Sequence, residues 1–239
     1  MANNKWNPDI QLKLSDEKCP ITPRDHQAAA WGRMSRYFLD DQKCAGLIVI
    51  PTGGGKTVVA AHWLLENHVR GGGRVLWLAH KRTLIRQAMN CFRMLANKAR
   101  PKNSLNLIAI SSEDCHWDAV SEDHDVVFST MQTAVLEANL PFVKQMIDDC
   151  AKGVFVVLDE AHHAAAPGYS RLVKMFRDKG CKLVGLTATP VRMDAEDQKL
   201  LAFLFRPNAE DKKVEKVEPI YQVSRRELTE KGILAAPSF

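Results

Sequence analysis

Six short apolar segments recur along this chain of 239 residues, and they constrain its fold more than any other feature. Each is four to six residues long and is rich in Val, Ile, Leu or Phe. The segments are Gly46–Ile50, Arg74–Ala79, Leu105–Ile110, Asp125–Ser129, Gly153–Leu158 and Leu183–Leu186. Apolar runs of this length are typical of strands that are buried on both faces, so we predict six buried strands.

Most of these segments are separated by stretches with apolar residues at helical spacing. The predicted helical stretches are Lys56–Val69, Thr83–Ala96, Gln132–Cys150 and Ser170–Asp178, the third of them interrupted by Pro141. Apolar strands that alternate with helices are typical of a predominantly parallel sheet with helices on both faces. The sequence therefore predicts an α/β domain, and domains of this class bind ligands beyond the carboxyl ends of their strands.

Composition agrees with one folded domain and excludes several other classes of protein. Hydrophobic residues make up 46% of the chain and charged residues 26%, which excludes collagen-like, low-complexity and disordered chains. The first residues lack the apolar stretch of a secretory signal, and no apolar run is long enough to span a bilayer. The six cysteines are scattered without a Cys-x-x-Cys pair. We therefore expect a cytoplasmic protein with reduced, mostly buried thiols and no membrane partner.

A glycine-rich segment follows the first predicted strand and leads into a predicted helix. It consists of Pro51, Thr52, Gly53, Gly54, Gly55, Lys56 and Thr57. Glycines let backbone N–H groups curl around a phosphate, and a helix amino terminus favours the same negative charge. At this spacing Lys56 can reach the β- and γ-phosphates of a nucleotide, and the Thr57 hydroxyl can ligate Mg²⁺. The strict pattern has Gly where this chain has Ile50, and a glycine-rich turn without a ligand is the alternative.

The fifth predicted strand runs directly into two carboxylates, Asp159 and Glu160. A carboxylate at a strand end beside a phosphate loop supplies a second contact to Mg²⁺, usually through ordered water. The adjacent Glu160 is then placed to polarise an attacking water. Taken alone, the pair also fits an ordinary solvated strand end, so its interpretation depends on the phosphate loop.

Together these segments resemble the motifs of superfamily 2 helicases and translocases, in the order expected for that superfamily. PTGGGKT at 51–57, LDEAH at 158–162 and LTATP at 186–190 resemble motifs I, II and III. RDHQ at 24–27 resembles the adenine-recognition element, and VLWLAHKR at 75–82 and VFSTMQT at 127–133 resemble motifs Ia and Ib. The resemblance covers about residues 21–192, together with a tail, residues 227–239, that is similar to the strand leaving the first motor domain.

Within the superfamily, the chain is most similar to the branch of type III restriction enzymes and DNA repair translocases. The Ala-His-Lys-Arg form of motif Ia and the Arg-x-x-Gln element carry this similarity. The RNA-dedicated DEAD-box branch is less similar, because its motif II ends in Asp where this chain has His162.

The resemblance implies a role for individual residues of each motif. Nucleotide binding would involve Arg24 and Gln27 at the adenine, Thr52, Gly53, Gly54, Gly55, Lys56 and Thr57 at the triphosphate, and Thr57 and Asp159 at Mg²⁺. Lys56, Asp159 and Glu160 would be catalytic, with Glu160 as the base. His162, Thr187, Thr189 and Arg192 would couple the nucleotide state to the grip on nucleic acid, although Arg192 also fits a simple surface cap. Nucleic acid would contact His80, Lys81, Arg82 and Thr130.

Charge is distributed unevenly along the chain. Residues 66–104 carry nine basic side chains and one acidic side chain, whereas residues 111–125 carry six acidic side chains and no Lys or Arg. Backbone phosphates are bound by such basic stretches, and His80, Lys81 and Arg82 at a strand end are the strongest candidates. For the arginines of the following helix, a solvated polar face is the alternative explanation.

The sequence therefore predicts the ATP-binding motor half of an ATP-dependent DNA helicase or translocase, with ATP and Mg²⁺ as cofactors and nucleic acid as partner. An RNA helicase and a nucleotide-gated nucleic-acid-binding module without translocation are the alternatives. We expect an N-terminal extension at 1–20, a RecA-like domain at 21–212, and a segment at 213–239 that leads toward a second RecA-like domain. Because that second domain would supply an arginine to the γ-phosphate, we expect this chain alone to bind ATP with little hydrolysis.

Overall fold

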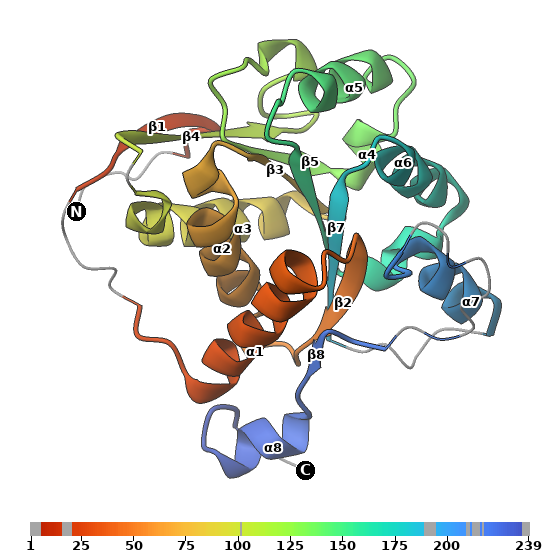
Figure 1. Cartoon of the computed structure of the whole chain (residues 1–239). Helices are drawn as coiled ribbons and strands as arrows, with labels where there is room; N and C mark the ends of the chain where they lie inside the picture. Colours follow the sequence, from red (N-terminus) through yellow and green to blue (C-terminus); the bar gives the residue numbers. More distant parts are fainter. Residues whose placement is uncertain are drawn as a thin grey trace.

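In a computed structural model of the chain, one eight-stranded sheet organises the molecule (Figure 1). The structure describes residues 6–15, 21–100, 102–188, 195–208, 211, 216 and 218–235. The strands are β1 (Asp9–Lys13), β2 (Ala45–Val49), β3 (Arg74–Ala79), β4 (Ser104–Ile110), β5 (Val126–Thr130), β6 (Val154–Asp159), β7 (Lys182–Thr187) and β8 (Tyr221–Gln222). Their order is β1-β4-β5-β3-β6-β7-β2-β8. β1 pairs with β4 antiparallel, and the other described strand pairs are parallel, which confirms the predicted class.

Helices cover both faces of this sheet (Figure 1). One face packs against α1 (Asp25–Ser35), α2 (Lys56–Asn67), α3 (Arg82–Leu95) and α8 (Arg225–Glu230). The other face packs against α4 (Met131–Ala134), α5 (Leu140–Asp148), α6 (Pro167–Asp178) and α7 (Ala195–Leu204). Short turns of helix connect these elements at η1 (Arg36–Asp40), η2 (Val69–Gly71), η3 (Ala96–Ala99), η4 (Trp117–Ala119) and η5 (Ala161–Ala165).

Strand β3 shows why the predicted strands read as continuous apolar runs. Its side chains alternate between the two cores: Val75, Trp77 and Ala79 face the α1–α3 side, and Leu76 and Leu78 face the other side. Since helices cover both faces, both sets of side chains are fully buried. All six predicted strands are present, with ends that differ by one residue or less from the predicted ends.

The third predicted helical stretch is divided into two helices. Thr130 caps α4 by accepting a hydrogen bond from the Thr133 amide, and α4 ends after four residues. Pro141 stands in the first turn of α5, where the missing N–H of a proline costs nothing. The proline therefore begins the second helix instead of bending a single long one.

The tail of the chain differs from its predicted form. The expectation that residues 227–239 resemble a strand is wrong for the described part, because residues 225–230 form α8 and residues 231–234 form turns. The Ser224 hydroxyl accepts a hydrogen bond from the Glu227 amide, and ion pairs four residues apart support the helix. The strand in this region is β8, which lies directly before α8.

Strand β1 lies within residues 6–15, which the sequence suggests are part of an extension. It pairs through five residues with β4 at the edge of the same sheet. The division into residues 1–20, 21–212 and 213–239 stays a prediction. None of the helices in the described part of the chain is long and apolar enough to cross a membrane. The five cysteines within the described residues are free, two of them buried and three partly exposed.

Replacing Gly32 with Ala is expected to raise the free energy of unfolding by about 0.5–1 kcal/mol, because Gly32 is an exposed interior residue of α1. A Cβ added there would meet no atom within 4 Å. Gly185→Ala is the matched control and should lower the free energy of unfolding. Its Cβ would lie 2.7 Å from the Cβ of Ala161 in a fully packed region. We expect that change to cost about 1–3 kcal/mol. Urea unfolding midpoints measure both, and a lower midpoint for Gly32→Ala would contradict the α1 geometry.

Candidate functional site

The phosphate loop joins the carboxyl end of β2 to the first residue of α2. Gly53 and Gly55 adopt left-handed backbone angles, with φ of 83° and 87°. A side chain at Gly55 would also overlap the Gln27 amide group. The loop is thus a tight backbone turn at a helix amino terminus, as the sequence predicts for a phosphate cradle.

Ile50, the departure from the strict loop pattern, belongs to the core. Its side chain is fully buried, and a Cβ added at Gly54 would lie 2.5 Å from its Cγ2 atom. Ile50 therefore supports the loop from the core side.

The amino end of α1 packs directly on the loop. Gln27 is buried, and its Oε1 atom accepts a hydrogen bond from the Arg24 backbone amide over 3.0 Å. Next to it, His26 is also buried, and its Nε2 lies 2.7 Å from the carbonyl oxygen of Gly54. Because a carbonyl only accepts, Nε2 must carry the proton. Sequence reasoning missed His26, and no sequence signal separates it from an ordinary core histidine.

Two carboxylates follow β6 beside this loop. Asp159, the last residue of β6, is buried, and Glu160 has a left-handed φ of 54°. Such an angle is unfavourable for a residue with a side chain, by about 1–3 kcal/mol, and clusters at functional sites. The Glu160 amide donates to Asp159 Oδ1 over 3.1 Å, and Glu160 Oε1 lies 3.4 Å from Lys56 Nζ. The fold thus joins motifs I and II through an ion pair.

The electrostatics of Asp159 suit a cation. Burial raises the pKa of this carboxyl, Lys56 opposes the rise and the nearby Glu160 adds to it, and together these effects bring the pKa to about 6. A buried carboxylate with a raised pKa is stabilised by any cation placed beside it. The oxygens of Thr57 and Asp159 are also the donor type that Mg²⁺ prefers. The residues present therefore fit Mg²⁺.

His162 lies between the ends of β6 and β7. Its Nδ1 is 3.3 Å from the hydroxyl of Thr187, the last residue of β7, and 3.5 Å from Glu160 Oε2. Burial, together with neighbouring His163, lowers the pKa of His162. Since β6, β7 and β2 are neighbours in the sheet, motifs I, II and III meet at one edge. Thr189 and Arg192 of the predicted coupling set lie outside the described residues.

The predicted nucleic-acid residues gather at the ends of the adjacent strands β3 and β5. His80 and Lys81 follow β3, and Thr130 ends β5. Gln132, which the sequence does not single out, donates from Nε2 to the His80 carbonyl oxygen over 3.0 Å and links the two strand ends. Lys81 is exposed, whereas the Thr130 hydroxyl already bonds Thr133.

Arg82, a predicted nucleic-acid contact, is already paired with two acidic side chains. Its guanidinium donates from Nε and Nη2 to the two oxygens of Asp114, over 2.7 and 2.6 Å, and it also pairs with Glu113. Lys102 likewise pairs with Asp125 over 2.9 Å. The basic and acidic stretches of the sequence therefore partly neutralise each other, and charge supports a nucleic-acid surface less than the sequence alone indicates.

Asp114→Asn is expected to lower the free energy of unfolding at pH 7 by about 2–3 kcal/mol. Burial alone would raise the pKa of Asp114, but hydrogen bonds from Arg82, Ser111 and Trp6 outweigh burial and lower it to about 2. A folded-state pKa below the unfolded value gives stability that is present above pH 4 and is lost as the pH falls toward 2. The wild-type advantage should therefore shrink between about pH 4 and pH 2 in denaturant titrations. Exposed Asp118→Asn is the control, and equal losses in both variants would contradict the assignment.

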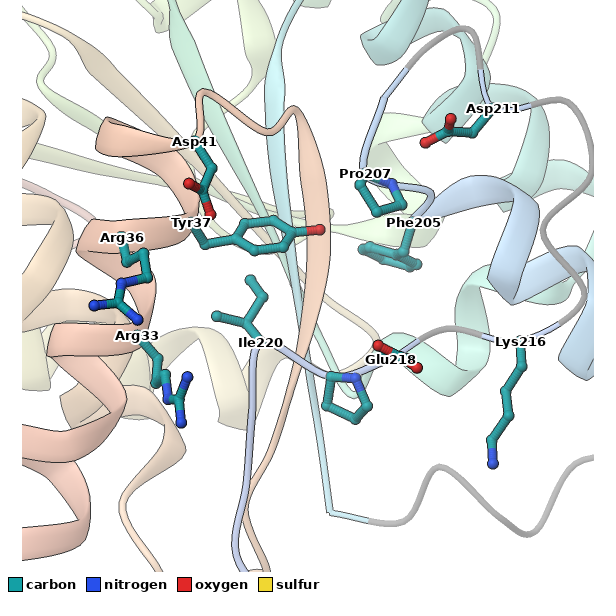
Figure 2. Close-up of a pocket in the computed structure, with 11 residues that line it drawn as sticks. Arg33, Arg36, Tyr37, Asp41, Phe205, Pro207, Asp211, Lys216, Glu218 and Ile220 are labelled. Atoms are coloured by element: carbon teal, nitrogen blue, oxygen red, sulfur yellow. The ribbon is translucent and has the colours of Figure 1, made fainter.

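A cavity of about 440 Å³ lies away from these motifs (Figure 2). Its wall includes Tyr37, whose hydroxyl donates to the carbonyl of Ala45 at the amino end of β2. Figure 2 shows apolar Phe205, Pro207 and Ile220 mixed with charged side chains of both signs. None of the predicted site residues lines it, and it lies at the opposite end of β2 from the phosphate loop.

This chain is similar to a protein-family model, to curated proteins and to solved structures. A family model described as "Type III restriction enzyme, res subunit" matches residues 20–192. The "General transcription and DNA repair factor IIH helicase/translocase subunit XPB" of Schizosaccharomyces pombe is 27% identical, covering 98% of this chain and 26% of that protein. The "Putative ATP-dependent helicase IRC3" of Saccharomyces cerevisiae is 26% identical, covering 74% of this chain and 25% of that protein.

Solved structures show the same fold at low identity. The Hef helicase domain of Pyrococcus furiosus superposes with a TM-score of 0.59 at 22% identity, covering 87% of this chain and 39% of that one. The type ISP restriction-modification enzyme LlaGI, in complex with a DNA substrate mimic, gives a TM-score of 0.56 at 17% identity, covering 89% and 21%. The chain spans about a quarter of the length of the curated relatives named above. Since the family model covers well over half of the chain, the chain belongs to the ResIII family, that of the type III restriction enzyme res subunit.

Proposed function

We propose that this chain is the first motor domain of an ATP-dependent DNA helicase or translocase. The observation that carries the proposal is the meeting of Lys56, which follows β2, with Glu160 and His162, which follow β6. Strand β7 lies between β2 and β6 in the sheet. A phosphate cradle, a carboxylate base and a third residue that contacts this base are the parts that nucleotide hydrolysis needs.

In this proposal the nucleotide enters between the phosphate loop and Asp159. The loop amides and the amino end of α2 would bind the phosphates. Gln27, which lies beside Gly55, would face the adenine ring of the nucleotide. Thr57 and Asp159 would hold Mg²⁺, which neutralises charge on the phosphate oxygens when it is bound.

Lys56 and Glu160 would exchange partners when the nucleotide binds. In the structure each neutralises the other across 3.4 Å. Phosphate oxygens would replace Glu160 as the partner of Lys56, which releases the Glu160 carboxylate. Glu160 would then accept a proton from the attacking water as the new bond to the γ-phosphorus forms and the bond to ADP breaks. We propose that a second RecA-like domain supplies a further cation to this transfer.

DNA is the proposed substrate, with contacts at His80, Lys81, Arg82 and Thr130. The S. pombe relative is named as part of a DNA repair factor. The alternative of RNA has support from the "Putative ATP-dependent RNA helicase MJ1505" of Methanocaldococcus jannaschii, which is 29% identical over 147 residues. Of the contact set, we expect exposed Lys81 to matter most, because Arg82 must first leave its acidic partners. The cytoplasmic location stays a prediction.

The test is the ATPase rate of the full-length protein with duplex DNA, single-stranded DNA or RNA. We expect stimulation by DNA, and a Lys81→Ala variant that needs more DNA for half-maximal stimulation and shows a weaker salt dependence. Lys179→Ala is the control, since this lysine pairs with Asp148 on the surface. Stimulation by RNA alone would favour the RNA alternative. Nucleic-acid binding that responds to nucleotide without movement on a track would favour the binding module.

A further inference from the structure

The described C-terminal residues 218–235, here called the C-terminal arm, run along β2 and reach the phosphate loop. Its backbone joins the sheet beside β2: the Ile220 amide donates to the Leu47 carbonyl over 2.7 Å, and the Val223 amide donates to the Val49 carbonyl over 3.1 Å. β2 is the strand that leads into the phosphate loop. The arm is therefore registered against this strand by hydrogen bonds before it reaches the loop.

Three glycines make room for three apolar side chains of the arm. A Cβ at Gly46 of β2 would lie 2.7 Å from Ile220 Cδ1. In the phosphate loop, a Cβ at Gly54 would lie 2.9 Å from Leu228 Cδ1. The third contact is at Gly53, where the same distance to Leu234 Cδ2 is 2.9 Å. The arm thus packs directly on two successive glycines of the loop, Gly53 and Gly54.

The arm has its own internal order. Leu228 is fully buried, and its carbonyl accepts hydrogen bonds from Ile233 and Leu234 over 2.8 and 3.2 Å. These bonds fold the chain after α8 back on the helix, which brings Leu234 to the same side as Leu228. In Figure 1, α8 lies at the foot of α1, next to β8. Leu228 and Leu234 therefore contact the loop from the same side of the arm.

A run of three glycines has many accessible backbone conformations and needs outside contacts to hold one of them. Ile50 supports Gly54 from the core, and Gln27 lies against Gly55. Leu228 and Leu234 supply corresponding contacts to Gly54 and Gly53 from the arm. Each loop glycine is thus held by at least one neighbour, and the arm provides two of these contacts.

We propose that Leu228 and Leu234 are positioning residues that hold the phosphate loop in its nucleotide-binding form. The inference rests on the proposed nucleotide site. It adds that nucleotide affinity depends on the packing of the arm against the phosphate loop. Truncating either side chain loosens the loop, so part of the binding free energy is spent on ordering it again. An arm that only stabilises the fold would lower the melting temperature without a selective effect on the loop.

The experiment compares Leu228→Ala and Leu234→Ala with Leu95→Ala in the full chain. Leu95 is also fully buried, but it ends α3, about 20 Å along the helix from the site edge. Hydrogen exchange of amides 52–57 and the Kd of Mg²⁺ with fluorescent ADP are measured for each. We expect faster exchange and a Kd weaker by about tenfold or more for the arm variants, against less than about threefold for Leu95→Ala. Leu228→Met, which keeps the volume, should restore both values.

Unchanged loop exchange and Kd in both arm variants would overturn the proposal, as would an equal effect of Leu95→Ala. If Leu228→Ala does not fold, Leu234→Ala decides, because the Leu234 side chain is only partly buried. A wild-type chain that binds no nucleotide would contradict the proposed function. Loop exchange, which needs no nucleotide, would then still decide whether the arm holds the loop.

Discussion

Glu160→Gln is expected to lower the ATPase turnover of the full-length protein by about 10²–10⁴-fold, the usual contribution of a general base. Glutamine keeps the size of the side chain but cannot accept the proton of the attacking water. ATP binding should be retained or tightened, because Lys56 loses the carboxylate that lies 3.4 Å away and is free for phosphates. Steady-state turnover and the Kd for ATP measure the two effects separately.

Two further variants sharpen this result. Lys56→Ala should weaken ATP binding itself, because the loop loses the cation that faces the phosphates. Glu137→Gln, the same chemical change at an exposed position away from the site, should leave turnover unchanged. Full activity of both Glu160→Gln and Lys56→Ala would remove the basis of the assignment.

Asp159→Asn is expected to raise the stability of the nucleotide-free chain and to abolish Mg²⁺-dependent nucleotide binding. Burial first, and Glu160 next, raise the pKa of the Asp159 carboxyl to about 6, so the folded chain at pH 8 holds an anion in an unfavourable place. Relative to an unfolded carboxyl this costs up to about 3 kcal/mol, which the amide avoids. The variant should therefore unfold at higher urea concentration at pH 8.

The pH dependence of this effect has a defined sign. The folded-state pKa of Asp159 lies above its unfolded value, so the cost is absent below about pH 4, grows between pH 4 and 6, and is complete above 6. The advantage of Asp159→Asn should therefore disappear toward pH 4. Asp148→Asn, at an exposed carboxylate paired with Lys179, is the control and should show no such gain. Equal stability of Asp159→Asn and wild type at pH 8 would contradict the assigned environment.

The buried strands could be predicted because burial on both faces leaves an uninterrupted apolar run in the sequence. The edge strands could not. β1 alternates exposed and half-buried residues at the sheet edge, and β8 has only two residues. Such short or one-sided elements carry little sequence signal, and their pairing with β4 and β2 provides their stability.

The location of the site motifs at one edge of the sheet could be predicted from the sequence for a similar reason. Lys56 and Thr57 follow the apolar strand β2, and Asp159 and Glu160 stand at the end of the apolar strand β6. The carboxyl ends of parallel strands share one edge of a sheet. Contacts between individual side chains could not be predicted from the sequence. Three such contacts join residues that are far apart in the chain. They are the ion pair of Arg82 with Asp114, the hydrogen bond of His26 to the Gly54 carbonyl and the packing of Leu228 on Gly54.

The α/β class, the positions of the buried strands and the position of the phosphate loop could be predicted from the sequence, because they depend on local apolar patterning and spacing. The pairing of charges and the choice of apolar side chains that support the loop became apparent in the folded chain. Ion pairing and packing depend on distances in space, which the order of residues along the chain does not contain. Arg82 and Asp114 therefore read as members of two opposed charged stretches in the sequence, and as partners in the fold.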